Sequence, residues 1–290
     1  MIIPFIEETF SQTLKRLVSG VNMGLEYDNI QSALYASGIK ISELIGKEKY
    51  NDIASGITEE DPEAGGALDI LQRAMLHMSL HSHLIFLVTR IGNDGITIKE
   101  GDGEKTLYKY QADELKESLI KDYWLWLNQL IELVEMPSNL PDCISSSDFK
   151  KFLGIDSSYF IAKITPIVNE EFEDNFKCRF SDAFLTTEDN KANIARALVY
   201  RSLYLAILRL PYEDLPDTIR RDIRNEYTIK NPPSEKEVRN SLSDIYNKKA
   251  LRYLTSLDLA YSSFKSSGVG RKFIKIGSDI NENDKFCSTC

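Results

Sequence analysis

The sequence lacks the patterns that mark membrane-spanning and secreted proteins. No apolar run approaches the roughly 18 residues that a membrane-spanning helix needs, and MIIPFIEETF at the start has no basic region before a long apolar stretch. The four cysteines, Cys143, Cys178, Cys287 and Cys290, are too few and too scattered for a disulfide framework. We therefore expect a protein that is made and used in a reducing cytoplasm.

The chain also has fewer basic residues than acidic ones. The chain has 44 acidic residues against 35 basic ones, a net charge of −9. Such a surface repels phosphate backbones and acidic membranes, which disfavours a general nucleic-acid-binding role. RRDIRNEYTIK (220–230) is the one local candidate for a basic recognition helix, and it is short.

Catalytic and cofactor-binding motifs are missing too. The chain has no G-x-G-x-x-G, Walker, G-x-S-x-G or kinase signature. All three histidines lie in HMSLHSH (77–83), where His77 and His81 are four residues apart. A helical zinc site would need further ligands and typically reads H-E-x-x-H. The CSTC sequence (287–290) has the spacing of a zinc half-site but stands in a polar tail. We expect no catalytic residue, no metal and no cofactor.

Helical periodicity is what the sequence does contain. Apolar residues recur at helical spacing over 28–53, 66–90 and 111–135. Between the last two, GITIKEGDGEKTLYKY (95–110) has two β-prone runs around Gly101-Asp102-Gly103, which predicts a β-hairpin. Trp124 and Trp126 are two apart, so both cannot point into one helical core. Trp126 is expected in the core and Trp124 at a contact surface or beneath the hairpin.

The second half of the chain repeats the first at a single shift of 123 residues. RAMLHMSLHSHLIFL (73–87) aligns with RALVYRSLYLAILRL (196–210) with five identities in fifteen, where chance gives roughly one. The same shift aligns 112–123 with 235–246 and 40–48 with 163–171. This pattern predicts a tandem duplication, with repeats near 25–136 and 148–260 joined by MPSNLPDCISSSD (136–148). The alternative is that any two amphipathic helices align at some shift.

The shift also offers a test of the histidines, because it places Tyr200 opposite His77 and Tyr204 opposite His81. Positions that hold His in one repeat and Tyr in the other call for a ring with a polar tip, which favours packing over metal binding. The expected fold class is therefore mainly α, with two tandem-duplicated helical-bundle units. The first covers 1–136 and carries the hairpin 95–110, the second covers 148–260, and an extended C-terminal tail follows at 261–290.

Two stretches resemble a known family. YASGIKISELIGKEKYNDI (35–53) and the segment 95–135 are similar to an uncharacterised family encoded in phages and prophages of Bacteroidetes, including gut phages. More distantly, ISELIGKEKYNDI resembles small helical head-to-tail connector proteins of tailed phages. The resemblance covers about 100 residues of the first unit, and we recognise no motif in the second unit or the tail. It implies a virion structural protein, with no catalytic residues to carry over.

We therefore expect a subunit of the phage neck that is made in the host cytoplasm and assembles into a homo-oligomeric ring. Its expected partners are the portal and other neck or tail proteins, with no membrane contact and only incidental contact with DNA passing through the ring. Another virion or host-interaction protein, or a cytoplasmic enzyme or regulator, remains an alternative. The expected assembly contacts lie in the long helix, the hairpin and the tail: Trp124, Ile98, Tyr108, Phe273, Ile274 and Ile276.

Overall fold

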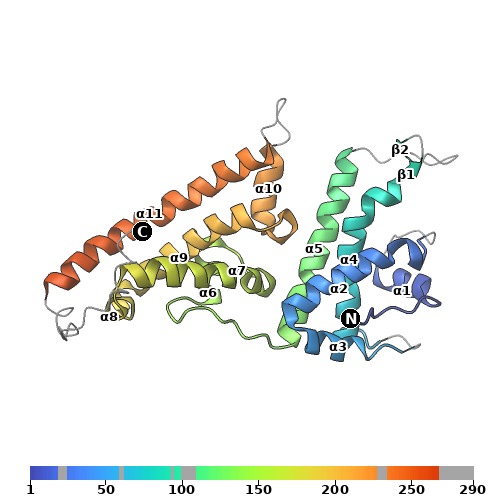
Figure 1. The fold of residues 1–290 in the computed structure, drawn as a ribbon, viewed down its shortest axis with the longest axis horizontal. Coiled ribbons are helices and arrows are strands. Elements are labelled where there is room, and N and C mark those ends of the chain that lie inside the picture. The colour runs from blue at the N-terminus through green and yellow to red at the C-terminus, as the bar shows by residue number, and fades with distance from the viewer. Residues whose placement is uncertain (19–24, 59–61, 93–94, 99–108, 227–233, 268–290) are drawn as a thin grey trace, which may run out of the picture. The chain divides into compact units, whose positions relative to one another are not determined.

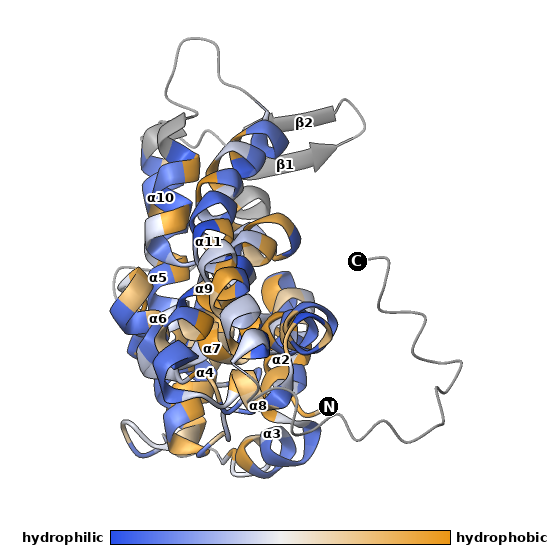
Figure 2. Cartoon of the chain, turned by 90° about the vertical axis from the view of Figure 1, so that its left-hand side faces the viewer, coloured by the Kyte–Doolittle hydropathy of each residue, from blue (hydrophilic) through white to orange (hydrophobic). Residues whose placement is uncertain are grey.

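The protein is mainly α-helical (Figure 1). The computed structural model describes residues 1–18, 25–58, 62–92, 95–98, 109–226 and 234–267. The chain divides into two compact units, Met1–Pro137 and Ser138–Cys290. Among the described residues, no helix is long and apolar enough to cross a membrane. Figure 2 shows instead that the helices mix hydrophilic and hydrophobic positions, as amphipathic helices do.

The first unit is built around one central helix. Its helices are α1 (Phe10–Leu17), α2 (Tyr27–Ile45), α3 (Lys47–Ala54), α4 (Ala67–Val88) and α5 (Lys109–Leu133). The central helix is α4, which packs against α5, α2, α3 and α1. Gly46 separates α2 from α3 at a φ of 91°, a conformation that glycine adopts without a Cβ penalty. The apolar faces of these helices form one core around α4.

The hairpin lies earlier in the chain than the sequence predicted. Strand β1 (Thr89–Gly92) pairs antiparallel with β2 (Gly95–Ile98), with Thr89 opposite Ile98. The predicted hairpin 95–110 is therefore wrong in position: Lys109 already begins α5, and the expected turn at 101–103 lies outside the described residues. Only two residues separate β1 from β2, and two-residue connections are the commonest in hairpins. The sequence did not predict the first strand, because the apolar residues at the end of α4 continue the helical pattern into it.

Trp124 and Trp126 exchange their expected places. Trp124 is only 9% exposed and lies on the buried face of α5 with Ile120 and Leu127. Trp126 is half-buried, and the guanidinium of Arg73 lies 4.8 Å from its ring centroid. The burial of Trp124 contradicts its expected place at a contact surface, whereas the alternative place beneath the hairpin stays a prediction. Which ring is buried depends on how α5 packs against α4.

The second unit also surrounds a central helix. It contains α6 (Ser146–Leu153), α7 (Ser158–Glu171), the π-helix η1 (Phe172–Lys177), α8 (Asp182–Leu185), α9 (Glu188–Arg209), the 3-10 helix η2 (Tyr212–Asp214), α10 (Asp217–Glu226) and α11 (Glu235–Ser266). Here α9 is central, packing against α11, α7, α6 and α8. Ser145 is the N-cap of α6 and Ser234 is the N-cap of α11, each in a capping box with an acidic residue three positions later.

The expected linker 136–148 mostly belongs to the second unit. The side-chain amide of Asn169 donates to the carbonyl oxygen of Asn139 at 3.1 Å, and Ile144 is buried. Ser145, expected in the linker, is instead the N-cap of α6. The proline and serine residues that suggested a flexible connection thus serve as turn and cap residues of an ordered segment.

Candidate functional site

A ladder of four phenylalanines runs along one side of the second unit. Phe172, Phe176, Phe180 and Phe184 are spaced four residues apart, and successive ring centroids are 6.4, 6.2 and 5.3 Å apart. The last three rings are buried, whereas Phe172 is half-buried. The ladder therefore has one partly open end at Phe172.

The opposite end of the ladder meets the C-terminal part of α11. The ring centroids of Tyr261 and Phe264 lie 4.9 and 5.5 Å from that of Phe184. Arg179 forms a bidentate ion pair with Asp258 close by. These contacts attach the last turns of α11 to the segment 179–184.

A buried carboxylate stands where α7 becomes the π-helix. Glu171 accepts hydrogen bonds from Arg201 Nε at 3.1 Å and Asn175 Nδ2 at 2.9 Å, and Arg201 Nη1 donates to Asn247 Oδ1 at 2.7 Å. Burial raises the pKa of Glu171 above its usual value, although Arg201 and Asn175 act in the opposite direction. The network joins α7, α9 and α11, and Asn175 connects it to η1. Because π-helices are rare and frequently lie at functional sites, η1 marks a candidate site.

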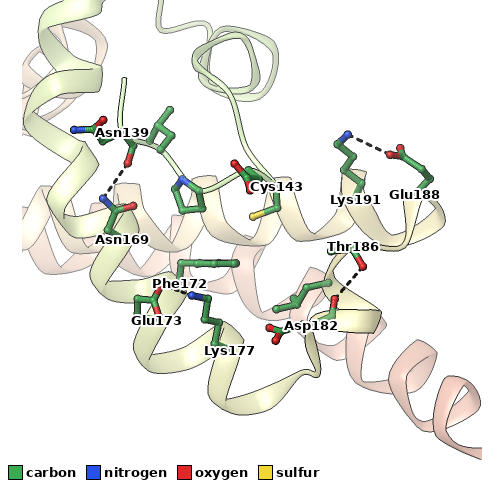
Figure 3. Close-up of a pocket in the computed structure, with 14 residues that line it drawn as sticks. Asn139, Cys143, Asn169, Phe172, Glu173, Lys177, Asp182, Thr186, Glu188 and Lys191 are labelled. Atoms are coloured by element: carbon green, nitrogen blue, oxygen red, sulfur yellow. Dashed lines mark hydrogen bonds and ion pairs between the residues drawn. The ribbon is translucent and has the colours of Figure 1, made fainter. Parts of the chain in front are cut away.

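A cavity of about 520 Å³ opens beside the π-helix, within the second unit (Figure 3). Its apolar lining comes from Leu140, Pro141, Phe172 and Leu185. The polar lining comes from the segment before α6, the end of α7, η1, α8 and the start of α9. An adjoining hollow of about 440 Å³ shares Asp142, Cys143, Glu188 and Lys191 with it. The open end of the phenylalanine ladder thus forms part of the cavity wall.

The cavity has an excess of negative charge. Its two lysines are paired within the site: Lys177 Nζ lies 2.5 Å from Glu173, and Lys191 Nζ lies 3.3 Å from Glu188. Asp142 and Asp182 also line the cavity, are exposed, and form no ion pair within the part of the chain that the structure describes. Four carboxylates against two ammonium groups leave a net charge of −2.

The lining suits binding better than catalysis. Burial raises the pKa of the Cys143 thiol to about 11, so the thiol is protonated at neutral pH and is a poor nucleophile. The hydroxyl of Thr186 donates to the carbonyl oxygen of Asp182 at 3.0 Å. Figure 3 shows the side chains of Lys177 and Lys191 on different sides of the cavity, each next to its own glutamate. An apolar surface bordered by exposed carboxylates is complementary to a ligand with apolar and cationic groups.

The histidine-rich helix is a packing element in this structure. His77 is buried, with Nδ1 2.7 Å from the carbonyl oxygen of Arg73 and Nε2 3.6 Å from Asp122. Burial lowers its pKa, more than the nearby Asp122 raises it. His81 and His83 are half-buried. Across the described residues, no group of three or more His, Cys, Asp or Glu side chains could hold a metal ion.

Of the expected assembly contacts, Trp124 and Ile98 lie among the described residues, and neither lines the cavity. Trp124 is buried in the first unit, and Ile98 ends β2, opposite Thr89. The other four expected contacts and the CSTC sequence lie outside the described residues. Sequence reasoning missed the cavity because it assigned 136–148 to a linker. The spacing of phenylalanines in F-x3-F-x3-F-x3-F (172–184) was the available signal.

Comparison with known proteins gives one match. Residues 27–152 match the model of a family of unknown function (DUF6712). The match begins with α2, covers the rest of the first unit and ends in α6. No curated protein and no solved structure matches the chain. Most of the cavity, from Asn169 onward, lies beyond the matched residues.

Proposed function

We propose that this protein is a structural subunit of a tailed-phage virion, located at the head-to-tail connector or neck. The proposal starts from the resemblance of 35–53 and 95–135 to a phage and prophage family and, more distantly, to connector proteins. The helical units form the body of a ring, and the hairpin and the C-terminal tail reach adjacent subunits or layers. The portal and other neck or tail proteins are the proposed partners.

The observation that carries the proposal is the similar construction of the two units. Shifted by 123 residues, α4 would cover 190–211, and α9 spans Glu188–Arg209. Shifted equally, α5 would cover 232–256, and α11 begins at Glu235. In each unit the central helix packs against the long helix that follows it and against an earlier helix: α4 against α5 and α2, α9 against α11 and α7. This correspondence supports a tandem duplication.

Individual residues support the duplication as well. Ser79 of α4 and Ser202 of α9 are matched by the shift, and both are fully buried. His77 lies next to Asp122 of α5, and the matched Tyr200 stacks on Tyr246 of α11 with centroids 6.5 Å apart. Both rings therefore face the long helix that follows their own. The hairpin has no counterpart in the second unit, where α10 stands at that point of the sequence.

A duplicated subunit is suited to ring formation because it presents two similar surfaces. Subunits that join head to tail through such surfaces close into a ring when the rotation between them permits. Exposed aliphatic side chains are available on the long helix of each unit, with Leu125 at 49% and Leu133 at 51% exposed on α5, and Leu259 at 68% on α11. These side chains are the proposed subunit contacts in place of Trp124.

The proposal is tested by the mass of the purified protein and by a search for it in intact virions. Native mass spectrometry and negative-stain microscopy should show a discrete ring, and virion proteomics should detect the chain. Leu259→Lys should weaken the ring, because it places a charge in an apolar contact. Asn240→Lys, at an exposed position near the other end of α11, serves as the matched control. A protein that stays monomeric at every concentration and is absent from virions would refute the proposal.

The tail has its own test. Deleting residues 268–290, which follow the end of α11, should leave the helical circular-dichroism spectrum unchanged. We expect the truncated subunit to be lost from assembled particles, because extended arms can order on binding and cover large areas. Normal incorporation of the truncated subunit would show that the tail does not join subunits.

A further inference from the structure

We infer that the cavity of the second unit binds residues 271–276 (RKFIKI) of the chain's own C-terminal tail. In the dilute subunit the segment occupies the cavity of its own chain. In an assembled ring, the same segment enters the cavity of a neighbouring copy. This exchange between copies rests on the proposed function.

The chemistry of the segment matches the cavity. Residues 271–276 carry three cations, Arg271, Lys272 and Lys275, and three large apolar side chains, Phe273, Ile274 and Ile276. In an extended segment, alternate side chains project to opposite faces, so each face has at least one cation and at least one apolar group. The cavity has the complementary combination of apolar side chains and carboxylates, and among the described residues Asp142 and Asp182 form no ion pair.

Charge distinguishes this segment from the rest of the tail. Residues 277–290 contain three acidic residues and one lysine, so the carboxylates of the cavity would repel them. Asp142 and Asp182 are the groups open to a cation from the tail, because Glu173 and Glu188 are engaged by Lys177 and Lys191.

The end of α11, from which the tail starts, lies close to the cavity. Phe264 of α11 contacts Phe184, and the next residue of the chain, Leu185, lines the cavity. Phe273 follows Phe264 by nine residues, which can span up to about 30 Å in an extended chain. An extended chain of this length is therefore long enough to reach from Phe264 to the cavity.

A short tether also explains why the chain's own segment is the occupant in dilute solution. Short flexible linkers give effective concentrations in the millimolar range, far above the micromolar protein concentration of an ordinary experiment. Exchange between copies becomes competitive when subunits are held together, as in domain swapping. The docked segment is thus an assembly arm kept by its own subunit until a neighbour is present.

Photo-cross-linking in the full-length protein tests this inference. A benzophenone analogue of phenylalanine replaces Phe273, the purified subunit is irradiated at micromolar concentration, and mass spectrometry locates the attachment sites. We expect attachment within 139–143, 172–177 and 182–191, in a product of monomeric mass whose yield does not change on tenfold dilution. A probe at Asn283, in the acidic part of the tail, is the matched control and should not label these residues.

Charge reversal tests the role of the two carboxylates. Asp142→Lys with Asp182→Lys should reduce the yield from position 273 at least about threefold, because two attractive contacts with the cations of the tail become repulsive. Asp244→Lys, an exposed carboxylate of α11 away from the cavity, should leave the yield unchanged. If the double variant loses helical signal, Lys272→Glu with Lys275→Glu tests the same attraction from the tail.

Attachment scattered over the surface, an equal loss in Asp244→Lys, or a product found only as cross-linked dimers in dilute solution would overturn the inference. These outcomes are independent of ring formation. A protein that forms no ring can still dock its tail, and a ring can form with the cavity empty.

Discussion

Replacing Asp69 by asparagine should destabilise the first unit. The Asp69 side chain is 2% exposed and accepts hydrogen bonds from Arg16 Nη1 at 2.6 Å and Arg73 Nε at 2.9 Å. Its second oxygen also accepts from the backbone N–H of Gly65 at 3.2 Å. The carboxylate therefore fastens α1 and the loop before α4 to the first turns of α4. Asparagine keeps the shape but removes the charge and replaces one acceptor oxygen with a donor.

The expected loss follows from the burial of the three groups. Removing one partner of a fully buried ion pair costs about 3–5 kcal/mol. The side chains of Arg16 and Arg73 are 22% and 20% exposed, so water partly compensates each guanidinium. We therefore expect a loss of about 2–3 kcal/mol in the free energy of unfolding, near the value of one hydrogen bond to a charged group.

The effect should depend on pH. Burial alone raises the pKa of Asp69, but the hydrogen bonds from Arg73, Gly65 and Arg16 outweigh it and lower the folded-state pKa. A carboxylate with a lowered folded-state pKa stabilises the protein above its unfolded pKa, and this contribution is lost as the pH falls through the folded pKa. The difference between wild type and Asp69→Asn should therefore be constant near neutral pH and shrink below about pH 4.

Tryptophan fluorescence provides the assay. The chain has two tryptophans, Trp124 and Trp126, and both lie in α5 of the first unit, so urea titrations followed by their emission report on that unit alone. Asp52→Asn, at an exposed carboxylate of α3, is the matched control and should change stability by less than about 0.5 kcal/mol. An Asp69→Asn midpoint equal to that of the control would refute the reasoning.

Three further substitutions test the packing inside each unit, and the reactivity of Cys143 tests its raised pKa. Gly38→Ala places a Cβ 2.7 Å from the Tyr50 hydroxyl and should cost about 1–3 kcal/mol, measured by the same fluorescence titration. Ser79→Ala removes a 2.6 Å hydrogen bond to the carbonyl oxygen of Met75 and a 2.9 Å hydrogen bond with the hydroxyl of Ser37, and should cost about 1–2 kcal/mol. Ser202→Ala removes a buried hydroxyl with no partner among the described residues, and should be neutral or stabilising in thermal melts followed by circular dichroism. Cys143 should react slowly with iodoacetamide at pH 8, and its rate should keep rising towards pH 11; rapid alkylation at neutral pH, seen by mass spectrometry, would contradict its raised pKa.

The sequence by itself determined the helical class and the placement of the long helices. Apolar residues at helical spacing predicted helices at 28–53, 66–90 and 111–135, and the structure has α2 with α3, α4 and α5 there. These predictions succeeded because an amphipathic period of 3.6 residues is a local property that any core of this kind must satisfy. The shift of 123 residues likewise came from the sequence alone and remains the basis of the proposed duplication.

Tertiary structure decided which of several acceptable local patterns is used. Trp124 and Trp126 both fit a helical period, and the packing of α5 against α4 leaves Trp124 buried and Trp126 half-buried. The hairpin begins at Thr89, where the sequence still continues the pattern of α4. The cavity is lined by several segments between Asn139 and Lys191. These segments lie together because α7 packs against α9. Periodicity describes one helix at a time, whereas the choice of buried face, strand register and cavity depends on partners distant in the sequence.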